Sequence, residues 1–554
     1  MKKSVQFVSR IAIAVVLLAA VGIAAWWDHA QPDEPLLTGG TSPQVENVQI
    51  ADARTLLACP GKPVLASLGE DPPESSDSSG DDTDSAGEDA DGSGADTGED
   101  ADGPGGDTGE DAEPPVGTYD PDYAPDEADA TSLINAMSLG PADSTPAPAL
   151  LETLLAQDDT SAAETVELSG SGAVHNGSLT TDGPAAFTAT TRADGAETPL
   201  VTGVRFGSAT AGDLRGIAAT PCIPAAAEQW LLGGQTEAGA SAKLELMNPS
   251  DTAATVRLEI WGAVGPIDPV GSKSVLVPPG EHRSILLEGL APGERRIAVR
   301  VQSSGARIGA VIQDVRTLGL QPAGVDYVAP SAPLSTEVRV PGIEIKDADE
   351  SLLRLLIPGN DPGLVNIKLI GPNGEVAAED LMEIEVPGGA VTDVSLRGVP
   401  EGSYTAVVES DVPITASGFV GTGEEDVERD IAWMPAVASD ETNIFALPET
   451  SVAVGQTLVM NGSEVDVPAR VFLVTDAGEL VEEEVRIAAG ETKEMDIPAA
   501  VDGEPVVGVL VESEQPITAG LALRAPEIEP AGVALLPATP RSILPSGIDV
   551  QLRR

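Results

Sequence analysis

An internal repeat of about 100 residues is the feature that most constrains how this chain can fold. The segment Val408–Ala416 recurs nearly unchanged as Val511–Ala519, and Val301–Ala310 is a weaker copy ahead of both. A unit of this kind buries its apolar face within itself or against the next copy. The sequence therefore predicts a tandem array of similar folded units.

Within each copy, apolar and polar residues alternate as they do in strands with one buried face. Val256, Leu258 and Ile260 interleave with Arg257 and Glu259, which is the period of two of a β-strand. Turn signals separate such segments at short intervals: Asn248–Asp251, Pro278–Gly280, Pro387–Gly389 and Ala489–Gly490. The pattern predicts an all-β fold of tandem immunoglobulin-like β-sandwich repeats, with a closed barrel or a propeller-like ring as the alternative.

A second recurring element, rich in proline, lies between the copies. Because proline favours edge strands and connections, we expect these pieces to join one sandwich to the next. The element occurs as Asp326–Pro330 ending in Val340–Pro341, as Asp430–Pro435 ending in Leu447–Pro448, as Val533–Pro537 ending in Leu544–Pro545, and in part as Pro221–Pro224.

The N-terminus carries the features of a membrane anchor. Lys2, Lys3 and Arg10 precede an apolar stretch from Ile11 to Trp27, which is marginally long enough to span a bilayer as a helix. Because basic residues favour the cytoplasmic side, we expect a single-pass transmembrane helix in the cell membrane, with the C-terminal body outside the cytoplasm. The alternative is a secreted protein, released by signal cleavage at the small residues Gly22–Ala24.

Cys59 and Cys222 are the only two cysteines in the chain. In an exported protein such a pair most simply forms one disulfide, while two unrelated buried thiols are the alternative. A bridge would close a loop of about 160 residues and stabilise the fold by at most about 5 kcal/mol in the chain-entropy description. We expect a structural clamp, because no Cys-x-x-Cys pair suggests redox exchange.

The chain is strongly acidic, with 89 Asp and Glu against 30 Lys and Arg and a net charge of −59. This charge argues against nucleic acid or anionic lipid as a partner of the body. Residues 69–130 are almost all acidic or small, so we expect a disordered acidic insertion there. Its pieces Gly87–Gly92 and Gly98–Gly103 resemble calcium loops, but their ligand spacing predicts no specific calcium site.

These patterns give an expected domain organisation. Leu150, Leu151, Leu154 and Leu155 have helical spacing, so one short helix is expected in the first domain. The segments are a cytoplasmic N-terminus at 1–10, a transmembrane anchor or signal segment at 11–27, a linker at 28–55, the first strand region of domain 1 at 56–68, the disordered acidic insertion at 69–130, the remainder of domain 1 at 131–235, and β-sandwich repeats at 236–340, 341–448 and 449–554.

A family resemblance covers nearly everything beyond about residue 50, apart from the acidic insertion. It is carried by Cys59–Gly61, Cys222, Trp230–Gly234, Asn248–Pro249 and Gly262–Pro266. In these segments the chain resembles an exported, membrane-anchored actinobacterial envelope family catalogued as domain-of-unknown-function family 5719. The resemblance implies an envelope location and this general build, and it supplies no functional residue.

The sequence offers no recognised constellation for catalysis. His29, His175 and His282 are scattered without metal-ligand spacing, and there is no nucleophile elbow, phosphate loop or dinucleotide fingerprint. We therefore predict no catalytic residues, no metal site and no cofactor. Trp230, Trp261, Tyr327 and Trp433 are candidate ligand-contact aromatics, and Trp261 and Tyr327 are the two we select; packing in the core or between domains is the alternative for each.

The function that these features favour is a non-enzymatic, extracytoplasmic, membrane-anchored scaffold or interaction protein of the bacterial cell envelope. Its expected partners are the membrane, through the N-terminal helix, and envelope proteins or glycans, but not nucleic acid. A carbohydrate-binding accessory protein in envelope glycan assembly is the alternative, and it depends on Trp261 and Tyr327. An enzyme with an unrecognised acidic site is the third hypothesis.

Overall fold

The computed structural model of the chain describes most of the residues beyond 130 and two short segments before them. The predicted anchor at 11–27 and the acidic insertion at 69–130 lie outside the described residues. Within the described part of the chain, no helix is both long and apolar enough to cross a membrane. The described residues are 45–49, 54–64, 131–140, 149–156, 159, 161–171, 173–190, 199–269, 274–319, 321–346, 350–376, 378–423, 429–449, 452–462, 464–528, 532–540 and 547–551.

The chain divides into two compact units. The smaller comprises residues 1–51 and 545–554, and within it β1 (Val45–Gln49) pairs antiparallel with β37 (Gly547–Gln551). The larger comprises residues 52–544 and holds all the other described strands. The all-β fold class is confirmed, because the only other described elements are two short 3-10 helices, η1 (Leu287–Gly289) and η2 (Glu379–Leu381).

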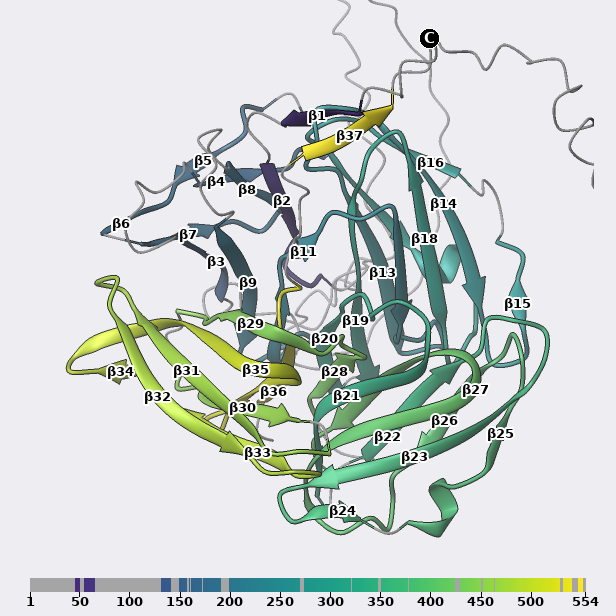
Figure 1. Ribbon diagram of the computed structural model, residues 1–554. Helices are drawn as coiled ribbons and strands as arrows, with labels where there is room; N and C mark the ends of the chain where they lie inside the picture. The colour runs from purple at the N-terminus through teal and green to yellow at the C-terminus, as the bar shows by residue number, and fades with distance from the viewer. Residues whose placement is uncertain are drawn as a thin grey trace, which may run out of the picture. The chain divides into compact units, whose positions relative to one another are not determined.

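The strands of the larger unit form four repeats, named A to D here, which follow one another along the chain (Figure 1). Repeat A contains β2 (Arg54–Cys59), β3 (Thr131–Leu139), β4 (Ala149–Thr153), β5 (Thr165–Glu167), β6 (Ser169–Ser171), β7 (Val174–Thr180), β8 (Ala185–Thr190), β9 (Leu200–Ala209), β10 (Gly216–Pro221) and β11 (Ile223–Pro224). Repeat B contains β12 (Glu228–Leu232), β13 (Ala240–Met247), β14 (Ala254–Trp261), β15 (Pro266–Ile267), β16 (Ser274–Val277), β17 (His282–Leu286), β18 (Ala298–Ser304), β19 (Gly309–Leu318) and β20 (Gln321–Val328). Repeat C contains β21 (Ser335–Ile345), β22 (Glu350–Leu356), β23 (Gly363–Gly371), β24 (Gly374–Val376), β25 (Ile384–Val386), β26 (Val391–Ser395), β27 (Gly402–Gly421) and β28 (Ile431–Pro435). Repeat D contains β29 (Asp440–Ala446), β30 (Gly455–Asn461), β31 (Val467–Thr475), β32 (Leu480–Ile487), β33 (Thr492–Ile497), β34 (Ala500–Val501), β35 (Glu504–Ala525) and β36 (Gly532–Pro537).

Each repeat has the same two antiparallel sheets. The first sheet has the order β10-β9-β3-β7 in A, β20-β19-β13-β17 in B, β28-β27-β22-β26 in C and β36-β35-β30-β33 in D. The second contains β2-β8-β4-β5 in A, β12-β18-β14 in B, β21-β27-β23 in C and β29-β35-β31-β32 in D. The 20-residue β27 and the 22-residue β35 take part in both sheets, whereas A and B use separate successive strands for this purpose.

The alternating apolar residues of the strands form a core between the two sheets. In β14, Val256 and Leu258 are buried while Arg257 between them is exposed. In repeat C, Leu353 from the first sheet and Ile367 from the second belong to one buried apolar cluster. Because burying such a side chain contributes roughly 1.5–3 kcal/mol, the period of two in the sequence sets which face of each strand is covered.

The short helix expected near Leu150 is absent, and this prediction was wrong. Leu150 and Leu151 lie in β4, which pairs with β8 on one side and with β5 on the other. Leu151 is fully buried in the core of repeat A. Helical spacing over so short a stretch is a weak preference, and the hydrogen bonds offered by two neighbouring strands outweigh it.

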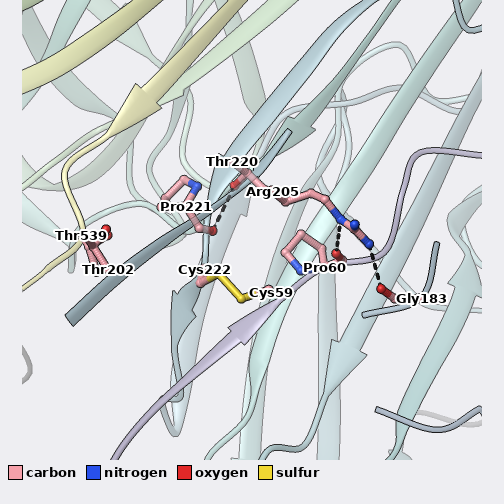
Figure 2. Close-up of a disulfide and its surroundings, with 9 residues drawn as sticks. All are labelled: Cys59, Pro60, Gly183, Thr202, Arg205, Thr220, Pro221, Cys222 and Thr539. Carbon is pink, nitrogen blue, oxygen red and sulfur yellow. Dashed lines mark hydrogen bonds between the residues drawn. A yellow bond between two sulfur atoms is a disulfide. The ribbon is translucent and has the colours of Figure 1, made fainter. Parts of the chain in front are cut away.

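The predicted disulfide is present between Cys59 and Cys222 (Figure 2). It links the last residue of β2 to the residue that follows β10, across a sequence separation of 163. Both cysteines are fully buried in repeat A. Beside them, the buried Arg205 side chain donates hydrogen bonds to the carbonyl oxygens of Pro60 and Gly183, as Figure 2 shows. The bridge and this cation together fix the segment that follows β2 against the rest of repeat A.

Candidate functional site

The last strand of each repeat, β10, β20, β28 and β36, lies at the junction of all four repeats, and we call these the central strands. They contact one another in a closed cycle, β10 with β20, β20 with β28, β28 with β36, and β36 with β10. Apart from the first residue of β20, every residue in them is buried. A strand covered on both faces can show a continuous apolar run instead of alternation. The sequences of β28 and β36 are such runs, whereas β10 includes Thr220 and β20 includes Gln321 and Asp326.

Each central strand also packs into the core of a neighbouring repeat. Ile217 of β10 belongs to the core of repeat D, Val533 of β36 to that of C, and Ile431 of β28 to that of B. Tyr327 of β20 packs with apolar residues of repeat A, among them Ala58. Every repeat therefore completes the packing of another, and the four depend on one another for burial of their apolar surface.

One carboxylate, that of Asp430, hydrogen-bonds to all four central strands. Its Oδ2 accepts hydrogen bonds from the backbone N–H of Ile217 (3.0 Å) and Val533 (2.9 Å). Its Oδ1 accepts hydrogen bonds from the N–H of Val325 (3.3 Å) and Ile431 (3.0 Å). The side chain is completely buried, and this burial raises its pKa to about 7, against the opposing effect of the four N–H donors.

Glycine occupies the matching positions of the other three repeats. Gly216, Gly324 and Gly532 each precede the residue whose N–H reaches Asp430, as Asp430 itself precedes Ile431. A Cβ on Gly216 would overlap the Asp430 carboxylate, and one on Gly324 would lie 2.6 Å from the Ile431 nitrogen. Both glycines have a positive φ, +139° and +106°, that other residues rarely adopt.

A second buried carboxylate, that of Asp326, connects three of the central strands from its place in β20. It accepts hydrogen bonds from the backbone N–H of Trp433 in β28 (2.7 Å) and of Ala219 in β10 (3.4 Å). Burial raises its pKa well above the ordinary value, and the nearby Asp430 carboxylate adds to that shift. The two carboxylates thus satisfy backbone donors that the ladders of the sheets leave unpaired.

The indole of Trp433 connects these strands to a pair of arginines. Its Nε1 donates a hydrogen bond to Asp314 Oδ2 (2.9 Å), which also forms an ion pair with Arg316 (2.8 Å). The Arg316 guanidinium lies 4.6 Å from the centre of the Phe419 ring, and that of Arg354 lies 5.0 Å from the Trp433 ring. Such buried cation–π and ionic contacts are costly to break singly, so they fix the positions of the strands that carry them.

A pocket opens at the carboxyl ends of the four central strands, and we call it the central pocket. In each central strand the residue that contacts Asp430 precedes the carboxyl end that reaches this pocket, so the four strands run in the same direction. The cavity volume is about 390 Å³, which lies within the range of small-molecule sites. It is lined by Pro221, Ile223, Pro224, Ala226, Glu228, Gln229, Trp230, Ala329, Pro330, Ser331, Ala332, Pro333, Ala436, Val437, Ala438, Asp440, Thr442, Asn443, Pro537, Ala538, Thr539 and Pro540.

The charged groups of the central pocket are both acidic. Glu228 accepts hydrogen bonds from Arg300 (2.6 Å) and from the Trp230 indole (3.2 Å), and the Arg300 contact lowers its pKa. Asp440 accepts a hydrogen bond from the backbone N–H of Thr442 (3.1 Å). No Lys, Arg or His is among the described residues that line the pocket.

The structure buries both aromatic residues that the sequence suggested for ligand contact. Trp261 is 7% exposed and packs against Trp230, with ring centres 5.3 Å apart. Tyr327 is 1% exposed, and its hydroxyl donates a hydrogen bond to the Gly61 carbonyl oxygen (2.7 Å). Ligand contact by these two residues stays a prediction, and of the candidate aromatics Trp230 is the one that lines the central pocket.

Sequence reasoning did not find the central pocket or the role of Asp430. The recurring proline element is visible in the sequence, but its prolines predict only a connection between sandwiches. No group of three or more His, Cys, Asp or Glu residues that could hold a metal ion is present among the described residues. The carboxylates of Asp430 and Asp326 accept hydrogen bonds from backbone N–H groups, and the pocket beyond them has a mostly apolar lining that includes Glu228 and Asp440.

The fold and site define an all-β repeat protein whose four repeats meet at a buried carboxylate, with a proline-lined pocket beyond it. Residues 177–498 match the family of unknown function DUF5719, from within β7 of repeat A to just past β33 of repeat D. Because the match covers more than half of the chain, the chain belongs to this family. No curated protein and no solved structure matches the chain.

Proposed function

We propose that this chain is a non-enzymatic interaction scaffold of the bacterial cell envelope, built from immunoglobulin-like repeats and held outside the cytoplasm by the segment at 11–27. The observation that carries the proposal is the junction of the four repeats at Asp430. Its carboxylate hydrogen-bonds to all four central strands, so the repeats act as one rigid body. A rigid body of this kind suits a protein that presents fixed surfaces to a partner.

The way buried charge is used supports this proposal. Asp430 and Asp326 both accept hydrogen bonds from backbone N–H groups, and the buried Arg205 donates to backbone carbonyl oxygens. Charged side chains in a catalytic site are usually aimed at a cavity where a substrate can reach them. Here they connect strands to one another, which is the arrangement expected of a rigid structural scaffold.

We propose the central pocket as the site where the partner binds. Its lining comes from the segments that follow all four central strands, so a partner bound there would contact all four repeats at once. The prolines in these segments restrict the backbone, which lowers the entropy lost on binding.

Site-specific photo-crosslinking of the full chain in its native cells tests the proposal. A photoreactive residue at the exposed, pocket-lining Ala438 should give a discrete crosslinked envelope protein. The matched control is the same residue at Asp502, which is exposed in a turn of repeat D away from the pocket lining. If neither position yields a crosslinked product, or if both yield the same smear of abundant proteins, the scaffold proposal fails.

A further inference from the structure

The central pocket combines an apolar lining with acidic charge, and this combination restricts what can fill it. Most of its lining residues are proline, alanine or other apolar residues, and Trp230 adds an aromatic surface. An apolar group that enters would be removed from water on several sides, which favours a compact hydrophobic body. A long flexible polar chain would gain little from this surface.

The acidic residues of the pocket, Glu228 and Asp440, have no positively charged residue beside them in the described part of the pocket lining. The carboxylate of Glu228 is engaged by Arg300 from outside the pocket, so its charge is largely compensated. Asp440 has no such partner, since no ion pair involving it occurs among the described residues, and its one side-chain hydrogen bond is from the Thr442 N–H. A positively charged group would therefore complement Asp440, and the net charge of −59 favours the approach of cations in general.

We propose that the central pocket binds an exposed basic segment of the partner protein, in which a compact apolar side chain enters the cavity and a neighbouring lysine or arginine meets Asp440. This inference rests on the proposed interaction function and names the chemistry of the partner. The hydrophobic contact supplies most of the affinity. The charge contact selects a basic segment over an acidic one of the same size.

Binding of two matched peptides to the full chain tests this inference by isothermal titration calorimetry at low ionic strength. The probes are acetyl-Ala-Phe-Lys-Ala-amide and acetyl-Ala-Phe-Glu-Ala-amide, which share the apolar side chain and differ in charge. The lysine peptide is expected to bind about five- to tenfold more tightly than the glutamate peptide, and added salt should reduce this ratio. Equal binding of both peptides, or no binding of either, would overturn the inference.

Three variants place the binding in the pocket. Asp440→Asn keeps an acceptor for the Thr442 N–H but removes the charge, so it should erase most of the preference for lysine. Ala438→Phe fills the pocket from an exposed lining residue and should abolish binding of the lysine peptide. Glu441→Gln is the matched control, because this exposed acid is next to Asp440 but does not line the pocket, and it should bind like the wild type. Unchanged binding in Ala438→Phe would place the peptide elsewhere and reject the inference.

Phenethylammonium, which has a similar apolar body and charge without a peptide backbone, separates the two sources of such a cation. If it binds in the pocket and the lysine peptide does not, the site takes a free organic cation and the proposal of a protein segment is wrong. A discrete crosslinked partner at Ala438 combined with no discrimination between the peptides would reject this inference and leave the scaffold function standing.

Discussion

Replacing Asp430 with asparagine tests whether one carboxylate holds the four repeats together. The substitution keeps the size and shape of the side chain but leaves only one oxygen to accept hydrogen bonds. Each Asp430 oxygen now accepts two backbone N–H groups. In the variant, the amide NH2 group would therefore face two N–H donors that have no other partner in this buried position.

The expected loss follows from those two unpaired donors. Leaving a buried donor without a partner costs about 1–3 kcal/mol, so two of them lower the free energy of unfolding by about 2–6 kcal/mol. Removal of the buried charge itself offsets part of this loss, because desolvation already disfavours the ionised carboxyl of Asp430. We therefore expect a net destabilisation in the lower half of that range at neutral pH.

Denaturant unfolding of the full chain, followed by tryptophan fluorescence, measures this change, since Trp433 lies in the central strand β28. The matched control is Asp411→Asn, because Asp411 is at the surface and accepts one N–H, from Leu364, which asparagine can also accept. The control should unfold within about 0.5 kcal/mol of the wild type. If Asp430→Asn did the same, the four hydrogen bonds would not be what joins the repeats, and the reasoning would be refuted.

Three further predictions concern the stability of the four joined repeats. Gly216→Ala should lower the free energy of unfolding by about 3 kcal/mol or more, because the new methyl group meets the Asp430 carboxylate and the backbone has a positive φ. Gly532→Ala should lower it clearly less in the same measurement, because its Cβ would lie 3.3 Å from an Ile217 side-chain carbon. The raised folded pKa of Asp430, about 7, adds a protonation-linked stabilisation that is fully present below the unfolded pKa and is lost as the pH rises towards and through 7. Titrations of the unfolding free energy should show this fall in the wild type and a smaller one in Asp430→Asn. The double variant Cys59→Ser with Cys222→Ser should lower the unfolding free energy by at most about 5 kcal/mol, and an unchanged denaturation midpoint would show that the bridge does not constrain the unfolded chain.

Strands with one covered face were predictable from the sequence, because burial on one side leaves a local trace. Val256, Leu258 and Ile260 alternate with polar residues, and the structure buries these three in β14. The disulfide was predictable for a similar reason, since two cysteines allow one pairing.

The central strands were not recognised as such because both their faces are covered by other repeats. Gly216–Pro221 and Gly532–Pro537 have no alternation, so their prolines suggested connections. The copies of the recurring element begin at Asp326 and at Asp430, whereas the hydrogen bonds place Gly324, not Asp326, at the position that matches Asp430. Local sequence cannot fix this register, since it depends on how four distant segments pack against one another. The central pocket, which is formed by the ends of those strands, was hidden for the same reason.

The presence of one aspartate and three glycines at the matching positions follows from the geometry of the junction. Four backbone N–H groups converge there, and one ionised carboxylate offers about four sites for accepting hydrogen bonds. A second carboxylate at Gly216 or Gly324 would find no free donor and would lie against the charge of Asp430. At the positions that match Asp430, a second acidic side chain is therefore unfavourable, and at Gly216 the missing Cβ leaves space for the Asp430 carboxylate. This requirement explains why the four repeats differ in sequence at these matching positions.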